Sequence, residues 1–274
     1  MIKSLQINRK KQSVYSYVYA LRIEKALAYR FDVFANILLQ CIVMFANVCF
    51  WRAVYAGEES VGGVTMTQML TYTVMSSVLA VLFATAVERR VMERVEKGAI
   101  AMDLLKPVPL FSIYFYEELG VVTSAAFMHA LPIYVIGSLW IGFMHAADSK
   151  AFVLFLVSVV LSFLINWLLA AWFYLLAFVT IHMEPLTQVK KHVLRLLSGS
   201  IIPIWFFPEW AQKILECLPF LYIYQLPLEL FIGRVSGAEV FKKIGLQMAW
   251  VIILYSCFRI CEKHVQKKLM IQGG

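Results

Sequence analysis

Charged residues are scarce in this sequence. They make up 15% of its 274 residues, whereas about 25% is usual for a soluble domain. Hydrophobic residues make up 61%, above the roughly 45–50% of soluble domains. This number of charged residues is too small to cover a water-exposed protein surface. The high hydrophobic content also excludes an intrinsically disordered chain. The composition therefore predicts an all-α protein that crosses a membrane several times.

The sequence also lacks the motifs of common enzyme classes. It contains no HExxH, no GxSxG, no CxxC and no grouping of His with carboxylates. It has no GxxxxGK[ST] phosphate-binding loop, because Gly63 and Val64 follow Gly57–Gly62 where Lys and Ser or Thr belong. We therefore expect no catalytic residue, no metal and no cofactor in this chain. The net charge of +8 is attributed to membrane orientation and anionic lipid rather than to a nucleic-acid partner.

Six apolar segments are long enough to cross a membrane, for which about 20 residues suffice. They cover approximately Val33–Val54, Met66–Val87, Leu119–Phe143, Ala151–Ile181, Leu186–Phe207 and Ile244–Cys261. Pro132 predicts a kink in the third segment, and Gly199 and Pro203 interrupt the fifth. We place Glu117 and Glu118 in the headgroup zone just before the third segment. No acidic residue is then expected at mid-membrane, which counts against a proton-coupled transporter.

The basic residues predict the orientation of these segments. Most of the 25 Lys and Arg residues precede the first segment, separate the second from the third and the fourth from the fifth, or follow the last. Because cytoplasmic flanks are rich in Lys and Arg, both ends of the chain are expected in the cytoplasm. The predicted organisation is a tail with an interfacial helix over residues 1–32, a six-helix membrane domain over residues 33–268, and a short tail over residues 269–274.

The stretch of residues 208–233, before the last span, is predicted to form a re-entrant helical hairpin on the outer side. Glu209–Leu218 has polar side chains on one helical face and apolar ones on the other, and it is too short to span. Phe220–Ile232 is also too short and is broken by Pro227. The alternative is an ordinary outer loop with hydrophobic residues. The residues expected to shape this exit segment are Pro203, Phe206, Phe207, Pro208, Trp210, Pro219 and Pro227.

The connection over residues 88–108 is predicted to lie in the cytoplasm and to contain two helices. A mixed-charge helix ends at Gly98, and a short helix over Ala99–Leu105 is stopped by Pro107. The short helix exposes apolar side chains in a stretch that cannot span, so it needs a partner surface. The alternative is that these side chains rest on the inner lipid surface. The candidate contact residues are Lys97, Gly98, Ile100, Met102, Asp103, Leu104, Leu105, Lys106 and Pro107.

Several motifs resemble those of bacterial ABC-2-type permeases. They are SGSIIPIWFFPEW at residues 198–210, LPFLYIY at residues 218–224 and DLLKPV at residues 103–108, together with Gly233 and the terminal IQGG. The resemblance implies a membrane subunit in the bacterial cytoplasmic membrane that pairs with an identical copy or a related permease. It also implies a separate ABC ATPase subunit, which binds ATP and magnesium and receives the short helix of residues 99–105.

The predicted function is therefore ATP-driven export through a path that two permease subunits form. A secondary transporter or channel that does not use ATP is the first alternative. A membrane-embedded enzyme acting on lipid is the second, and it requires a cluster of His, Asp or Glu near one interface, which the sequence does not show. Copurification with an ATPase supports the exporter, whereas transport driven by a proton gradient without ATP supports the first alternative.

Overall fold

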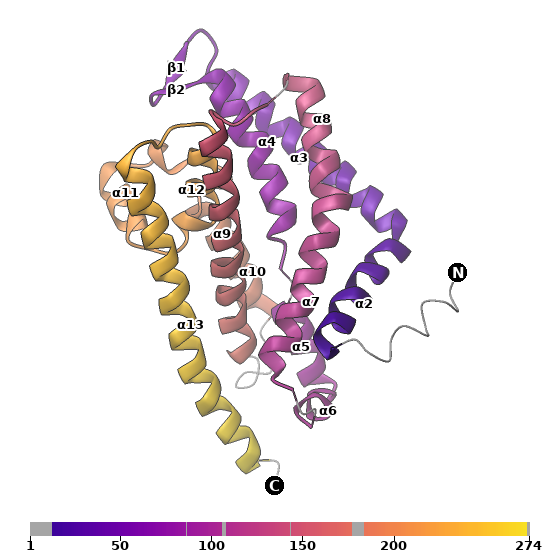
Figure 1. Cartoon of the computed structure of the whole chain (residues 1–274). Helices are drawn as coiled ribbons and strands as arrows, with labels where there is room; N and C mark the ends of the chain where they lie inside the picture. The colour runs from indigo at the N-terminus through magenta and orange to yellow at the C-terminus, as the bar shows by residue number, and fades with distance from the viewer. Residues whose placement is uncertain (1–12, 86, 106–107, 143, 177–183, 273–274) are drawn as a thin grey trace.

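The computed structural model describes residues 13–85, 87–105, 108–142, 144–176 and 184–272. Most of them are helical (Figure 1). In chain order the α-helices are α2 (Val14–Ala28), α3 (Arg30–Val54), α4 (Met66–Leu82), α5 (Val87–Glu96), α6 (Ile100–Leu104), α7 (Leu110–Ala125), α8 (Leu131–Ile141), α9 (Ser149–Leu176), α10 (Glu184–Leu197), α11 (Glu209–Glu216), α12 (Leu221–Phe231) and α13 (Ala238–Gln272). The other elements are strands β1 (Ser60–Val61) and β2 (Val64–Thr65), the π-helical segment η2 (Ala126–Ala130) and the 3₁₀ turn η3 (Ile204–Phe206).

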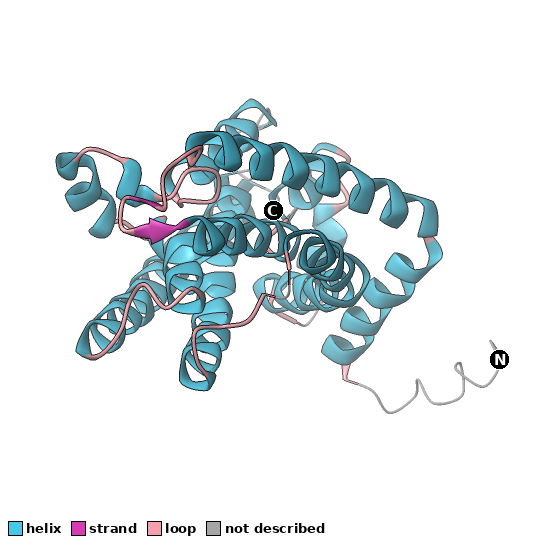
Figure 2. Ribbon diagram, turned by 90° about the horizontal axis from the view of Figure 1, so that it is seen from above, coloured by secondary structure: helices cyan, strands magenta, loops and turns pink. Residues whose placement is uncertain are grey.

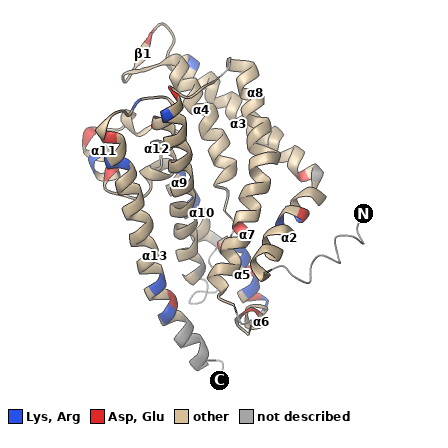
Figure 3. Ribbon diagram, in the orientation of Figure 1, with Lys and Arg blue, Asp and Glu red and all other residues tan. Residues whose placement is uncertain are grey.

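Five helical stretches among the described residues are long and apolar enough to cross a membrane. They are Phe31–Val54, Met66–Glu96, Leu110–Ile141, Ser149–Phe173 and Ala238–Val265. Helices α11 and α12 add a sixth if this pair, bent by 104°, is counted as one broken span. Charged residues gather toward the two ends of the bundle, around α5 and α6 and around α11 (Figure 3). The structure thus confirms the predicted all-α, multi-pass membrane protein.

The packed core is built around α9. Its Ile165, Ala170 and Ala171 are fully buried, and the helix lies against α12 and α13. Gln247 of α13 crosses this contact, where its amide donates to the carbonyl oxygens of Ser158 and Tyr222 at 3.0 and 2.9 Å. Buried polar groups need such partners in an apolar surrounding. Figure 2 shows the bundle from the end that carries β1 and β2, with α3 running obliquely along one side toward α2.

Short-range signals fix the start of α4. The side chain of Thr65 accepts from the backbone N–H of Gln68, and the Gln68 side chain accepts from the backbone N–H of Thr65. The β1–β2 hairpin precedes this cap and is held by the Tyr55 hydroxyl, which donates to the Val64 carbonyl at 3.1 Å. Burial raises the pKa of Tyr55 above its usual value, so this hydroxyl stays protonated at neutral pH.

The third predicted span begins earlier than the sequence suggested. Helix α7 starts at Leu110, so Glu117 and Glu118 lie inside a spanning stretch rather than before it. Both carboxylates are paired with arginines and can therefore be buried within the bundle, and their place in the headgroup zone stays a prediction. The irregularity expected near Pro132 takes the form of η2, a π-helical segment that ends two residues before this proline.

The fifth predicted span, over Leu186–Phe207, is wrong as a single helix. Helix α10 ends at Leu197, and Gly199 adopts a left-handed φ of 77° that turns the chain. A Cβ at this position would lie 2.3 Å from the Gln225 side-chain oxygen, so any other residue would force the buried Gln225 side chain to shift. The residues that follow fold into η3 instead of continuing α10.

Candidate functional site

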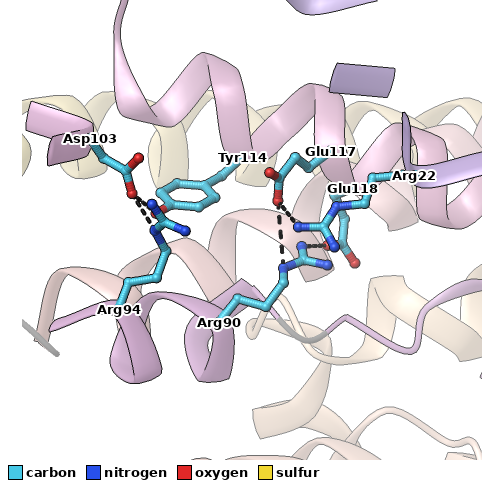
Figure 4. A network of polar contacts seen from close by, with 7 residues as sticks. All are labelled: Arg22, Arg90, Arg94, Asp103, Tyr114, Glu117 and Glu118. Carbon is cyan, nitrogen blue, oxygen red and sulfur yellow. Dashed lines mark hydrogen bonds and ion pairs between the residues drawn. The ribbon is translucent and has the colours of Figure 1, made fainter. Parts of the chain in front are cut away.

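A network of ion pairs joins α2, α5, α6 and α7 at the end of the bundle opposite to the β1–β2 hairpin (Figures 1 and 4). Arg90 of α5 pairs with Glu118 of α7, and its Nε lies 3.8 Å from Glu117. Arg22 of α2 binds the same Glu117 through a 2.5 Å contact between Nη2 and Oε2. Glu118 is fully buried, so its charge depends on Arg90. Removing one partner of a buried ion pair costs about 3–5 kcal/mol.

The network extends to the short helix α6 through a second arginine. Arg94 of α5 pairs with Asp103 of α6, and the Tyr114 hydroxyl of α7 lies 3.5 Å from the same carboxylate (Figure 4). The Asp103 side chain is only 5% exposed, whereas that of Arg94 is 42% exposed. Gly98, with φ of 67°, makes the turn between α5 and α6. The orientation of α6 is therefore set by an ion pair and not by apolar packing alone.

A further buried pair connects α5 to α10. Lys190 Nζ lies 2.5 Å from Glu88 Oε1, and both side chains are nearly inaccessible. At the break between α4 and α5, the Asn166 amide of α9 donates to the Phe83 carbonyl at 2.9 Å, as expected for a polar residue that bonds between helices. The acids Glu88, Glu117 and Glu118 are thus balanced by Arg22, Arg90 and Lys190. This balance lowers the cost of placing six charges inside a helical bundle.

Helices α2 and α7 are in direct backbone contact, which brings Arg22 into the network. A Cβ on Gly120 would lie 2.6 Å from the Tyr19 carbonyl oxygen, so only glycine permits this approach. The Tyr19 hydroxyl donates to Thr123 at 3.2 Å, and Tyr15 stacks on Tyr116 at 4.9 Å between ring centroids. The predicted N-terminal helix is therefore a packed element of the bundle.

A second group of polar residues lines a groove along α3, α4 and the end of α10. From α3 it receives Gln40 and Asn47, and from α4 it receives hydroxyl groups one turn apart. Ser76 Oγ donates to the Ser200 carbonyl at 2.6 Å, which ties α4 to the turn after α10. The full lining consists of Gln40, Val43, Asn47, Tyr72, Thr73, Ser76, Ser77, Ala80, Arg195, Ser200, Ile201 and Tyr224, and we call this the polar groove.

One edge of the polar groove is bordered by α10, whose outer face is apolar and unpacked. Leu186, Val189, Val193 and Leu196 recur at helical spacing and are 40–58% exposed. Lys190, on the inner face of the same helix, is buried against Glu88. Helix α10 therefore buries one of its charged side chains, Lys190, whereas Lys191 and Arg195 are exposed together with the apolar stripe.

The Gln225 side chain of α12 holds the bent α11–α12 pair to the rest of the bundle. Its Oε1 accepts from the Tyr72 hydroxyl of α4 at 2.9 Å and from the Ile204 backbone N–H of η3 at 3.1 Å. Its Nε2 donates to Glu229 at 2.8 Å, and Glu229 in turn binds Lys243 of α13 at 3.1 Å. This buried chain separates the polar groove from a cavity of about 560 Å³ at the β1–β2 end, which Glu229, Lys243 and Arg234 line.

The predicted exit-segment residues are gathered at this bent pair. Pro203 precedes η3, Pro208 precedes α11, and Pro219 lies in the bend before α12. Phe206 stacks on Trp51 at 5.1 Å, the Phe207 carbonyl accepts from Gln212 at 2.7 Å, and Trp210 is 69% exposed. Contrary to the prediction, Pro227 does not break the second helix, because α12 continues through it from Leu221 to Phe231. Pro227 and nine of its ten α12 neighbours are buried, so packing stabilises the helix despite the missing N–H.

Some of the predicted coupling residues hold α6 to the bundle, and others are exposed on its surface. Asp103 is buried in its ion pair, and Ile100 is partly buried against the core. Met102 and Leu105 are 68% and 79% exposed. Lys97 and Gly98 form the turn before α6. The side chain of Leu104, and residues Lys106 and Pro107, lie outside what the structure describes.

Sequence reasoning missed the ion pairs that join α2, α5 and α7. Arg22, Arg90 and Glu118 come from three distant segments, and no spacing connects them. The one signal in the sequence was that these residues are charged and lie next to apolar segments, where charged residues tend to be paired and functional. Among the described residues, no group of three or more His, Cys, Asp or Glu side chains is placed to hold a metal ion.

The family of the chain follows from a match over most of its length. Residues 41–273 match the family described as ABC-2 family transporter protein, so the chain belongs to the ABC-2 transporter family. It is a multi-pass membrane protein and the membrane component of an ABC transporter, a transport component that is not itself catalytic. Members of this family typically work with an ATPase partner. Comparison with curated proteins gave no match.

Proposed function

We propose that this chain is the membrane subunit of an ATP-driven exporter in the bacterial cytoplasmic membrane. In this proposal both ends of the chain are cytoplasmic, and a separate ABC ATPase subunit binds ATP and magnesium. Helix α6 docks on that ATPase. The observation that carries the proposal is α6 itself, which exposes Met102 and Leu105 at a charged end of the bundle while Asp103 ties it to α5. Exposed apolar side chains on a short, fixed helix favour a protein partner.

The ion-pair network supplies the mechanical connection that coupling requires. A force applied to α6 is passed through Arg94 to α5, and from α5 through Arg90 to α7 and through Glu88 to α10. Because α10 borders the polar groove, movement at the ATPase end reaches the groove through contacts that are buried and charge-balanced. The proposed roles of Arg90 and Arg94 are to position helices, not to contact the transported molecule.

The polar groove is the proposed wall of the translocation path. The amides of Gln40 and Asn47 belong to the spanning helix α3 and are only partly buried, and polar groups are unfavourable against lipid, so a second permease subunit is expected to cover this side of the groove. The apolar outer stripe of α10 beside the groove is suited to that subunit contact. The second subunit is an identical copy or a related permease, and the bent α11–α12 pair closes the outer end of the path.

The test is coexpression of the tagged chain with the ABC ATPase subunits of its own genome. The proposal predicts that one ATPase copurifies and that its ATP hydrolysis rises when the pair is reconstituted. Replacing Met102 and Leu105 together by Asp should abolish copurification, because it places charge on the docking surface. The matched control, Met102→Leu with Leu105→Met, keeps the surface apolar and should retain binding. Transport driven by a proton gradient without ATP would overturn the proposal in favour of a secondary transporter.

A further inference from the structure

A second groove opens between α4, η2, α8 and the beginning of α9. It encloses about 850 Å³ and is lined almost entirely by apolar side chains. Ala126 and Ala130 of η2 form one wall, and Phe152, Val153 and Leu156 of α9 form the other. The small side chains of η2 leave the space that the larger residues of α9 border. We call this the apolar groove.

Polar residues line the apolar groove at one end only. His145, Asp148 and Ser149 lie where the chain passes from α8 to α9, at the same end of the bundle as β1 and β2 (Figure 1). From there the apolar walls run into the spanning stretches Leu110–Ile141 and Ser149–Phe173. The groove thus has a polar mouth at the expected membrane surface and an apolar interior at the depth of the hydrocarbon. A molecule with a polar head and a long apolar chain matches this arrangement.

The two grooves lie on opposite faces of α4. At 100° per residue, Thr73, Ser76 and Ala80 share the arc that faces the polar groove, whereas Met75 and Val78, which line the apolar groove, point to the other side. A second permease subunit that covers the polar groove therefore cannot also cover the apolar groove. Val153, at 59% exposed, and Leu156, at 47%, then face the bilayer.

We propose that the apolar groove binds one bilayer phospholipid, with an acyl chain between η2 and α9 and the headgroup beside His145 and Asp148. The volume falls within the range of about 300–1,000 Å³ that is usual for ligand sites. Lipid fills this space because hydrocarbon, and not water, surrounds the helices at that depth. This inference rests on the proposed function in one respect: it assumes that the second permease subunit covers the polar groove, on the opposite face of α4.

The test uses the full chain in vesicles of phosphatidylethanolamine and phosphatidylglycerol that contain a small share of a phospholipid with a photoreactive diazirine in its acyl chain. After irradiation, cross-linked peptides are mapped by mass spectrometry. The proposal predicts lipid adducts concentrated on η2 and the first half of α9 relative to the lipid-exposed face of α3. Val153→Trp should fill the groove and reduce these adducts to the level found on α3.

Val160→Trp is the matched control, because Val160 lies on the same helix, is 60% exposed and does not line the groove. This variant should keep the adducts. Ala126→Phe fills the groove from the opposite wall and should repeat the loss, so that the result does not depend on the folding of one variant. Adducts spread evenly over all lipid-facing helices, or cross-links from the groove to a second protein chain, would overturn the proposal. Because no ATPase is present, failure here is distinct from failure of the proposed exporter function.

Discussion

Replacing Gly199 by Ala should destabilise the attachment of the bent α11–α12 pair. The new Cβ would lie 2.3 Å from Gln225 Oε1 and 3.1 Å from the Tyr72 hydroxyl, both of which are buried. The Gln225 oxygen accepts two hydrogen bonds, so displacing it breaks at least one of them. A buried polar group left without its partner costs about 1–3 kcal/mol. The left-handed backbone at residue 199 adds about 1–2 kcal/mol for any residue with a Cβ.

A control variant separates these two costs. Gly237 has a similar φ of 65°, but a Cβ added there would meet no atom within 4 Å, so Gly237→Ala carries the backbone cost alone. Thermal unfolding of the purified protein should show a lower Tm for Gly199→Ala than for Gly237→Ala. In soluble domains of 150–250 residues, each kcal/mol shifts Tm by roughly 2–4 °C. Adding Gln225→Ala should make the Gly199→Ala loss smaller than additive, because the closest contact of the new Cβ is then removed. Equal Tm values for the two glycine variants would refute the proposed role of Gln225.

Two further predictions concern the ends of the bundle. Arg94→Asp and Asp103→Arg should each lower stability by about 1.5–3 kcal/mol, the value of a hydrogen bond to a charged group, and should reduce ATPase copurification. The combined exchange should recover most of both losses, and a double variant no better than the singles would show that the pair does not position α6. In a cysteine-free background, a cysteine at Lys213 of α11 should react with a membrane-impermeant thiol reagent added outside intact cells. A cysteine at Glu93 of α5 should react only after the cells are opened, and the reverse pattern would invert the assigned orientation.

The local features of the fold could be predicted because they depend on short-range chemistry. The Thr65–Gln68 capping box, the turn at Gly98 and the amphipathic character of α11 are all properties of a few consecutive residues. The fifth segment was predicted to be interrupted by Gly199 and Pro203, but its hydrophobicity still led to α10 and the residues after it being counted as one span. A left-handed glycine, whose conformation is visible only in the structure, separates them.

The composition and the apolar segments by themselves determined that this chain is a helical membrane protein, and its motifs indicated the ABC-2 family. These properties depend on the overall composition or on a few consecutive residues, so they can be read without knowing which segments are in contact. Tertiary structure decided how the charges are used. Glu118 is buried in the bundle, and Arg90, 28 positions earlier in the chain, is the partner that allows it. The two faces of α4 became a polar and an apolar groove only because α3 and α10 pack beside one face and η2 and α9 beside the other. Partners so far apart in sequence meet through packing, which no periodicity within a single helix encodes.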